Sequence, residues 1–369
     1  SQIYVRRLTS DFVPAALPNE WDHANHGWAS YGQSSQGTGI SQTFTPSTDA
    51  ALALDSAGNP MVAWLEETGD AVRGPSHIYF KRWTGSRWEE LGDSGHFDGL
   101  SKMKYGVEQP ALAYNELGTT ADVYVKRWDP ATSQWIALGH SMNAGGISRT
   151  GLVWGPLDVA VDSANRISVA WTSGAAGDVY LQRWSGAAWQ NLGTSGYGAG
   201  VSGTGASVQA RFPKIAIGPN DRIYMTWQQA TGVTWNIYMK YWTGSAWSSL
   251  GGSATLGGVS DSYAISITPD IAVTPSGMPV IVWDEGPEGL PGEARDNDDI
   301  YMRTWNGTAW VDIAGSTDER GLSWASMDTL NPRLALTQIG SPVVVWDDTA
   351  LTQSVTGVAG EPITAILVA

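Results

Sequence analysis

The segment Ile78–Trp83 reads IYFKRW, and at period two one face holds Ile78, Phe80 and Arg82 and the other Tyr79, Lys81 and Trp83. Alternation at period two with apolar atoms on both faces predicts a β-strand that lies between two layers. A second apolar segment, WEELG, follows from Trp88 after a glycine-containing turn and predicts a partner strand. The same pair of segments returns downstream, starting at Val123, Val179, Ile237 and Ile300.

Two further strand patterns precede each pair, so that the repeated unit contains four strands. Strand one is an apolar segment that usually begins with proline, a residue tolerated at the head of a strand. Strand two follows a turn rich in Gly, Asn and Asp and ends in tryptophan. These tryptophans are Trp64, Trp171, Trp227, Trp283 and Trp346, and a Gly-x-Ser marker after strand four ends at Ser41, Ser101, Ser148, Ser202, Ser260 and Ser323.

The spacing of the markers indicates the fold class. Consecutive markers lie between 47 residues (Ser101 to Ser148) and 63 residues (Ser260 to Ser323) apart, and no helical pattern interrupts them. Four-stranded units at this period are typical of β-propellers. The unit at Pro110 has no strand-two tryptophan, so we expect the ALAY segment after Pro110 to be strand one of a blade with a short hairpin.

The two ends of the chain together supply one more unit. The N-terminus reads SQIYVRRL and matches strand three, and Trp28 begins a segment that matches strand four. The region from Pro332 to Trp346 matches strands one and two. We therefore expect an all-β, six-bladed propeller over residues 1–346, with four-stranded blades, a closing blade built from both termini and an insertion at 9–27.

The C-terminal tail, residues 347–369, contains one strand pattern too many. Strand three of the fifth unit starts 17 residues after its tryptophan (Trp283 to Ile300), and 17 residues after Trp346 is Ile363. An extra β-strand at 362–369 therefore competes with the N-terminal strand for one place. The residues of these two candidate assembly strands are Ile3, Tyr4, Val5, Ile363, Ala365, Ile366, Leu367 and Val368.

Two interpretations of the surplus strand stay open. Both strands are used within their own chain, or one of them pairs with a neighbouring molecule. Strand addition supplies main-chain hydrogen bonds and pockets for alternate side chains. Repeated head to tail, such a contact makes a filament.

Charge and cysteine content narrow the function further. The formal net charge is −15 and the pI is about 4.6, which argues against nucleic acid and against anionic lipid as partners. The chain has no cysteine and no apolar run near the ~20 residues that a membrane span needs. Because a strand pattern begins directly at Ser1, we expect an extracellular or cell-surface protein whose signal peptide has been removed.

A few residues fall outside the repeat and are candidates for binding. Trp21, Trp154 and Trp235 have no counterpart in the other units and are candidates for exposed ligand contacts. Asp296, Asp298 and Asp299 form an oxygen-rich cluster of the kind that a structural calcium ion prefers, although the spaced ligand series of a calcium hand is missing. No other cofactor is expected.

The layout resembles secreted prokaryotic β-propeller repeat proteins, with a lectin-like or sialidase-like arrangement of units. The turns TGSRW, SGAAW, TGSAW and NGTAW lack the aspartate of the sialidase Asp-box. The resemblance implies a carbohydrate-binding lectin with sugar sites between blades as one alternative. A glycosidase is a further alternative, with carboxylates from the set Asp284, Glu285, Asp347 and Asp348.

The function that we expect is structural. The chain is expected to be a non-enzymatic, adhesive propeller that self-assembles into a filament or surface array through its surplus terminal strand. Its partner is then a second copy of itself, and cell-surface glycans are the partner under the lectin alternative.

Overall fold

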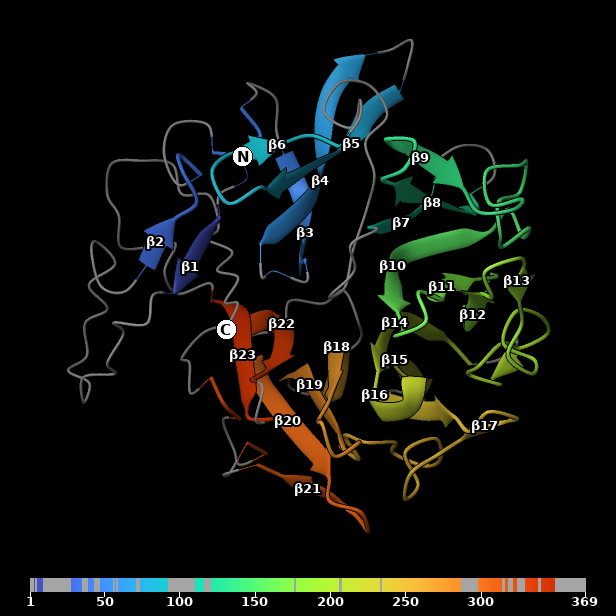
Figure 1. The fold of residues 1–369 in the computed structure, drawn as a ribbon. Coiled ribbons are helices and arrows are strands. Elements are labelled where there is room, and N and C mark those ends of the chain that lie inside the picture. The colour runs from blue at the N-terminus through green and yellow to red at the C-terminus, as the bar shows by residue number, and fades with distance from the viewer. Residues whose placement is uncertain are drawn as a thin grey trace.

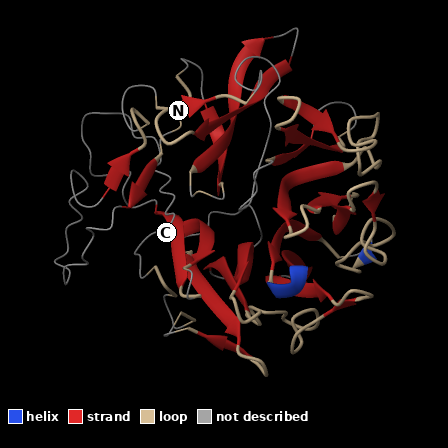
Figure 2. Cartoon of the chain, viewed as in Figure 1, coloured by secondary structure: helices blue, strands red, loops and turns tan. Residues whose placement is uncertain are grey.

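A computed structural model describes residues 3, 5–8, 28–34, 39–42, 47–55, 57, 59–70, 74–91, 110–115, 121–175, 177–205, 208–232, 234–286, 298–313, 316–317, 321–323, 329–337 and 340–348. Over these residues the fold is all-β, and helical structure is limited to short 3-10 turns such as Pro219–Asp221 (Figure 2). Within the described ranges, no helix has the length and apolar character required to cross a membrane.

Four sheets contain four antiparallel strands each, in chain order. The first sheet holds β3 (Ser47–Leu54), β4 (Pro60–Asp70), β5 (Gly74–Trp83) and β6 (Trp88–Glu89). The next holds β10 (Val153–Val161), β11 (Ile167–Ser173), β12 (Asp178–Trp184) and β13 (Trp189–Gln190). Another holds β14 (Ala210–Ile217), β15 (Ile223–Thr231), β16 (Thr234–Trp242) and β17 (Trp247–Ser248). The last holds β18 (Ile265–Val273), β19 (Pro279–Gly286), β20 (Asp299–Trp305) and β21 (Trp310–Asp312).

Three smaller sheets complete the described fold. One has three strands, β7 (Ala111–Asn115), β8 (Val123–Asp129) and β9 (Gln134–Ala137). The N-terminal pair is β1 (Arg6–Leu8) with β2 (Trp28–Ser30). The C-terminal pair is β22 (Thr329–Leu336) with β23 (Pro342–Asp348).

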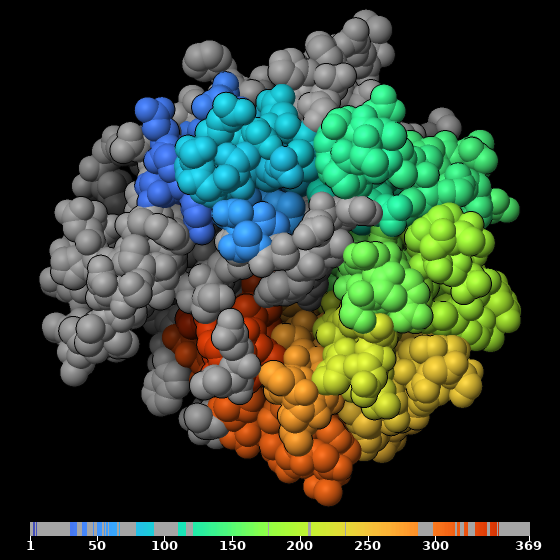
Figure 3. Space-filling view, viewed as in Figure 1, coloured from blue at the N-terminus to red at the C-terminus, as the bar shows by residue number. Residues whose placement is uncertain are grey.

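The sheets stand around a common centre in a β-propeller-like ring (Figure 1). The first strand of each four-stranded sheet lies toward the centre and the short fourth strand lies outside. Innermost strands of consecutive sheets contact one another, as β10 contacts β14 and β14 contacts β18. In the space-filling view, successive parts of the chain follow one another around the face (Figure 3). The predicted all-β class is confirmed, and the count of six blades stays a prediction.

The three-stranded sheet corrects one assignment made from the sequence. Strand β7 does not take the place of strand one. Its Tyr114 pairs with Tyr124 and stacks on it with ring centroids 5.7 Å apart, as the strand-two residue Trp171 stacks on Tyr180. Pro110 therefore heads strand two, and tyrosine replaces the expected tryptophan. The error arose because Pro110 lies at a distance from Ser101 that also suits strand one.

The two terminal pairs form as the repeat template predicts. Leu8 pairs with Trp28, which reproduces the pairing of Trp83 with Trp88 at the junction of strands three and four. Strands β22 and β23 supply strands one and two at the other end of the chain. Within the described residues β1 and β23 are not paired with each other, so their union in one closing blade stays a prediction.

Innermost strands have one edge that no further strand covers, and side chains from the preceding sheet occupy part of it. The Asp158 carboxylate of β10 accepts a hydrogen bond from the Ile215 N–H of β14 at 2.7 Å. Asp270 of β18 does the same for the Leu334 N–H of β22 at 2.9 Å. Both carboxylates are buried, so these bonds satisfy edge donors that would otherwise lose their hydration.

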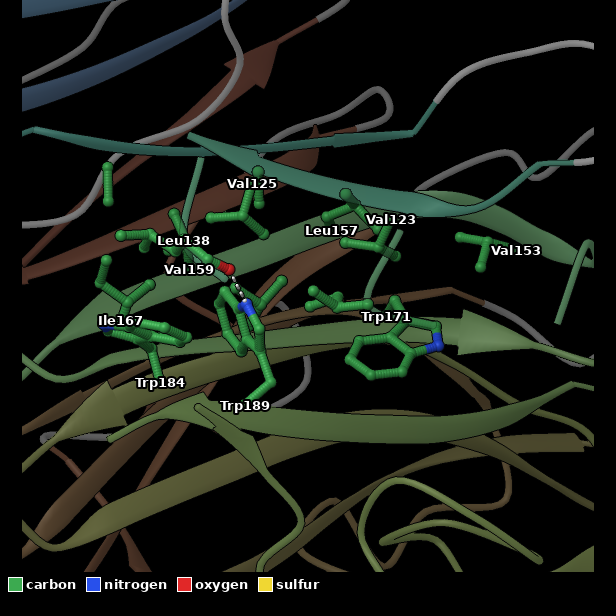
Figure 4. Close-up of a cluster of buried hydrophobic side chains, with 14 residues drawn as sticks. Val123, Val125, Leu138, Val153, Leu157, Val159, Ile167, Trp171, Trp184 and Trp189 are labelled. Atoms are coloured by element: carbon green, nitrogen blue, oxygen red, sulfur yellow. Dashed lines mark hydrogen bonds between the residues drawn. The ribbon is translucent and has the colours of Figure 1, made fainter. Parts of the chain in front are cut away.

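The strand-four tryptophan joins each sheet to the one before it. The Trp189 indole N–H donates to the Leu138 carbonyl of the preceding unit at 2.8 Å, within a cluster of buried side chains from both sheets (Figure 4). Gly139, beside that leucine, has φ +60°, and a Cβ on it would lie 3.0 Å from the Trp184 ring. The same indole-to-carbonyl bond recurs for Trp88, Trp135, Trp247 and Trp310 at 2.8–2.9 Å, with Tyr31 accepting from Trp88.

The strand-two tryptophans form the interior of the ring. Trp64, Trp171, Trp227 and Trp283 are almost fully buried, and each stacks on a strand-three tyrosine. These repeated indoles pack inside the scaffold and are not available to stack on sugars.

Replacing Trp247 with phenylalanine tests the inter-sheet bond. The variant keeps an aromatic ring but leaves the Leu192 carbonyl without its indole donor. We expect the free energy of unfolding to fall by about 1–3 kcal/mol, as for other buried groups that lose a partner. Trp242→Phe is the matched control, since the Trp242 indole of the same described sheet packs on Trp247 without donating a hydrogen bond. If denaturant unfolding shows the same loss of stability in the two variants, the hydrogen bond from Trp247 to Leu192 contributes nothing to stability.

Candidate functional site

Each innermost strand contains a bulge near its first residues. The residue before the strand-one proline has a positive φ in four sheets: +72° at Gly155, +56° at Phe212, +45° at Thr268 and +54° at Asn331. Residues before proline normally avoid helical conformations, and a β-branched residue such as Thr268 is strained at positive φ. The bulge opens the ladder between strands one and two and turns this residue out of the sheet.

The end of strand two holds the bulge of the following sheet in place. The residue after the strand-two tryptophan accepts a hydrogen bond from the bulge N–H: Gln228 from Thr268 at 2.9 Å, and Asp284 from Asn331 at 3.3 Å. Thr172 does the same for Phe212 at 3.3 Å. Polar and aromatic side chains are thereby fixed around one end of the inner strands, which makes this end the candidate site.

Asp284 and Glu285, considered above as glycosidase carboxylates, are structural in this arrangement. Asp284 is 1% exposed and also accepts a hydrogen bond from the Thr268 hydroxyl. Glu285 accepts from the Trp283 indole at 2.9 Å and from the hydroxyls of Ser266 and Ser262 at 2.7 and 2.8 Å. Both acids lie in β19 and make part-buried hydrogen bonds, so they are not solvated loop residues. Glu66 makes the equivalent bond to Trp64 in the first sheet.

The tryptophans outside the repeat have different surroundings. Trp154 is partly exposed at the start of β10, and its indole N–H donates to the Gly174 carbonyl at 3.0 Å. Trp235 is only 5% exposed, which contradicts its expected exposure. The cause is Arg211, whose guanidinium lies 4.0 Å from the centroid of the Trp235 ring. Trp21 lies outside the described residues.

The aspartates proposed for calcium take part in the repeat. Asp299 accepts a hydrogen bond from Ser323 at 2.6 Å, and Ser323 accepts from the Ile300 N–H at 3.1 Å. The marker serines Ser148 and Ser202 bond to Asp122 and Asp178 in the same way. The Asp298 carbonyl accepts from Thr329. No group of three or more metal-ligating side chains occurs in the described part of the chain, which does not include Asp296.

The N-terminal strand makes the bonds that a strand three of the repeat makes with its marker. The Ile3 N–H donates to Ser41 at 3.4 Å and the Ile3 carbonyl accepts from Ile40 at 2.8 Å. Val123 makes the same two bonds with the marker that contains Ser148. Ile3 and Val5 are each 8% exposed. The sequence identified this strand, but its bond to the serine of the marker was not foreseen. Tyr4 and the candidate strand Ile363–Val368 lie outside the described residues.

Glu285 offers a test of the structural role. We expect Glu285→Ala to lower the free energy of unfolding by about 1–3 kcal/mol, because the Trp283 N–H and two serine hydroxyls lose their acceptor. Glu285→Gln is the control, since Gln229 accepts from Trp227 in the neighbouring sheet at 3.0 Å. Urea unfolding should show a smaller loss for the glutamine variant. If Glu285→Gln lowers the free energy of unfolding as much as Glu285→Ala does, the site requires the negative charge rather than the hydrogen bond.

Alkaline pH tests the burial of Tyr301. Burial, and then the charges of Glu285 and Asp299, raises the pKa of Tyr301 to about 12 from an ordinary 10.0. Because the folded phenol holds its proton more tightly, its stabilising contribution is complete below pH 10 and is lost as the pH rises through about 12. In Tyr301→Phe we expect the stability, measured by urea unfolding, to fall less steeply across this window. A pH dependence identical to that of the parent protein contradicts this assignment.

Comparison with known proteins gives no family. No family model matches the chain, and neither does any curated protein. Among solved structures, a Penicillium chrysogenum alpha-L-arabinanase is similar with a TM-score of 0.44 at 12% identity, over 83% of this chain and 90% of that one. A polysaccharide lyase, an ulvan lyase, is similar with a TM-score of 0.47 at 13% identity, over 78% and 77% of the two chains. A Dyadobacter fermentans protein of unknown function is similar with a TM-score of 0.43 at 12% identity, over 81% and 93%.

Proposed function

We propose that the chain is an extracellular, non-enzymatic assembly module. It has six blades, the closing one shared by the two termini, and it joins copies of itself by donating the tail strand Ile363–Val368 to a neighbouring copy. One observation carries this proposal. The N-terminal strand makes the strand-three contacts of the repeat inside its own chain, through Ile3 with Ile40 and Ser41. A second strand-three segment is therefore left without a place.

The composition of the two segments supports this division of roles. The N-terminal segment keeps the repeat tyrosine as Tyr4 and the repeat cation as Arg6. In the described sheets the equivalent cation reaches the preceding marker, as Lys240 does by donating to the Val201 carbonyl at 2.8 Å. At the same two positions the tail has Thr364 and Ile366. The tail segment thus lacks the side chains that fit a strand three to the scaffold.

The tail is nevertheless a strong strand pattern. Ile363, Ala365 and Leu367 would lie on one face, and Ile366 and Val368 on the other. A strand that is apolar on both faces is stable only between two layers, where burial of each large aliphatic side chain contributes about 1.5–3 kcal/mol. Such a strand in water is a hazard for aggregation, and donation to a defined acceptor removes that hazard.

The acceptor that we propose is the edge of β23 that faces away from β22 in the neighbouring copy, where the donated strand lies between β23 and the N-terminal strand β1 of that copy. Within the described residues β23 pairs only with β22, whereas the other strand-two elements of four-stranded sheets, such as β11 and β19, pair on both sides. An added strand supplies the main-chain hydrogen bonds that this edge lacks. Because donor and acceptor surfaces differ, the contact is heterologous and propagates into a filament.

Deleting Pro362–Ala369 tests the proposal. We expect the full chain to form concentration-dependent polymers in light scattering and electron microscopy, and the truncated chain to remain a folded monomer. A synthetic peptide with the deleted sequence should bind the truncated chain and cap the filaments of the full chain. If the truncated chain polymerises as the full chain does, the tail strand is not the assembly element and the proposal is wrong.

A matched pair of substitutions removes the effect of shortening the chain. Ile366→Asp with Val368→Asp places two charges in the strand segment and should abolish assembly, because buried unpaired carboxylates cost several kcal/mol. Gln353→Asp with Thr356→Asp adds the same charge to the tail outside that segment and should leave assembly intact. Equal behaviour of the two double variants attributes any loss to net charge and not to the strand.

A further inference from the structure

Arg211 interrupts the pattern of the innermost strands. It lies directly before the bulge residue Phe212 on β14, opposite Gln228. The residues at the same register position in four other sheets carry no charge, namely Thr48, Trp154, Ile267 and Leu330. The scaffold therefore forms without a cation at this position, and a departure from a repeated rule points to function.

The Arg211 guanidinium has no hydrogen-bonding or charged partner in the part of the chain that the structure describes. Among the described residues it forms neither an ion pair nor a hydrogen bond, and its Nε is closed off from solvent. Burial lowers the pKa of Arg211 with no contribution from a neighbouring charge. Arginines of the neighbouring units are paired, since Arg183 donates to Asp162 at 2.6 Å and Arg303 donates to the Val259 carbonyl at 2.7 Å.

Aromatic rings hold the unpaired cation in one orientation. The guanidinium stacks 4.0 Å above the Trp235 ring and lies 5.6 Å from the Phe212 ring. Phe212 is fixed in turn, because its N–H donates to Thr172 and its ring packs where a Cβ on Gly155 would be, 3.2 Å away. Trp154, the residue before Gly155 on β10, is partly exposed. A guanidinium that is already held in place by aromatic rings loses little conformational freedom when it binds an anion.

We propose that Arg211, Phe212 and Trp235, with Trp154 beside them, form an oxyanion-binding site for a carboxylate or sulfate group on a soluble ligand. Of the three guanidinium nitrogens only Nε is buried without a partner, so the two Nη groups are the ones that donate to such a group in the two-point geometry that guanidinium favours. A partly desolvated, unpaired cation is unfavourable in the empty state, and an anion relieves that cost. The partly exposed rings of Phe212 and Trp154 suit a ligand with a flat or cyclic body, such as an acidic sugar.

This site is independent of the proposed assembly. Arg211 lies at the start of β14, whereas the proposed acceptor edge belongs to β23 in another sheet. Loss of anion binding therefore leaves polymerisation unchanged, and loss of the tail leaves anion binding unchanged.

The test uses the full chain and the variant Arg211→Ile, which installs the residue that Ile267 provides in the next sheet. The probes are sodium acetate, sodium sulfate and a uronic-acid trisaccharide, each against sodium chloride at equal ionic strength. We expect a saturable change in tryptophan fluorescence and a rise in Tm for the parent protein. In the variant the apparent Kd should weaken by roughly tenfold or more, as expected for loss of a charge-assisted pair.

Arg222→Gln is the matched control. Arg222 also lies on an aromatic ring of the same sheet, 5.3 Å from the Tyr241 centroid, but it is exposed and at the opposite end of β14. The Arg222→Gln variant should show the same fluorescence change and the same rise in Tm as the parent protein. A response to acetate and sulfate alone identifies a simple anion site, and a response confined to the trisaccharide identifies an acidic glycan as the source of the carboxylate.

The contrary results are equally clear. Unchanged binding in Arg211→Ile, or no saturable response of the parent protein to any of the three probes at millimolar concentration, overturns the proposal. If the isoleucine variant does not fold, Arg211→Lys keeps the charge without the planar fork and should bind several-fold more weakly. If the Arg211→Lys variant binds the anion as tightly as the parent protein does, the proposed two-point site is also overturned.

Discussion

The hydrogen bond from a strand-four indole to the carbonyl of the preceding unit is the contact on which the ring depends. Each sheet is apolar on both faces and is stable only when neighbours cover it. The bond from Trp189 to Leu138 fixes how far one sheet lies from the next. Gly139 permits this approach, because its positive φ and missing side chain leave room for the Trp184 ring. The burial of the strand-two tryptophans depends on that spacing.

The repeat made most strands predictable, including the N-terminal strand at Ile3 and the pair formed by Leu8 and Trp28. What failed were assignments that depend on contacts between the strands of one sheet. Tyr114 replaces a tryptophan by stacking on Tyr124, which a search for tryptophan cannot detect. Trp235 is buried because a residue 24 positions earlier lies over it. The structural role of Glu285 depends on hydroxyls brought to it by β18. Sequence periodicity places residues on strands, and it does not state what the neighbouring strand presents.

Repetition also separates scaffold from candidate function. Asp299 looked like a cation ligand in isolation, yet Asp122 and Asp178 make the same bond to a marker serine. A chemical role shared by equivalent residues in several sheets is a requirement of the fold. Arg211 is informative for the opposite reason, because its sheet has a charge where the others have none and provides no counter-ion among the described residues. The comparison between units within one chain thus serves as an internal control.

The same reasoning explains why the chain ends matter. A propeller-like ring leaves only short strand edges exposed, but a ring closed by two separate chain ends has a joint that is held only by noncovalent pairing. Ile3 ties the N-terminal strand to its own unit through the same bonds that Val123 makes. Strand β23 has strand-two sequence without a third strand in the described structure. An unpaired edge and a surplus apolar strand each cost free energy in isolation, and this cost is the physical reason for the pairing between molecules that we propose.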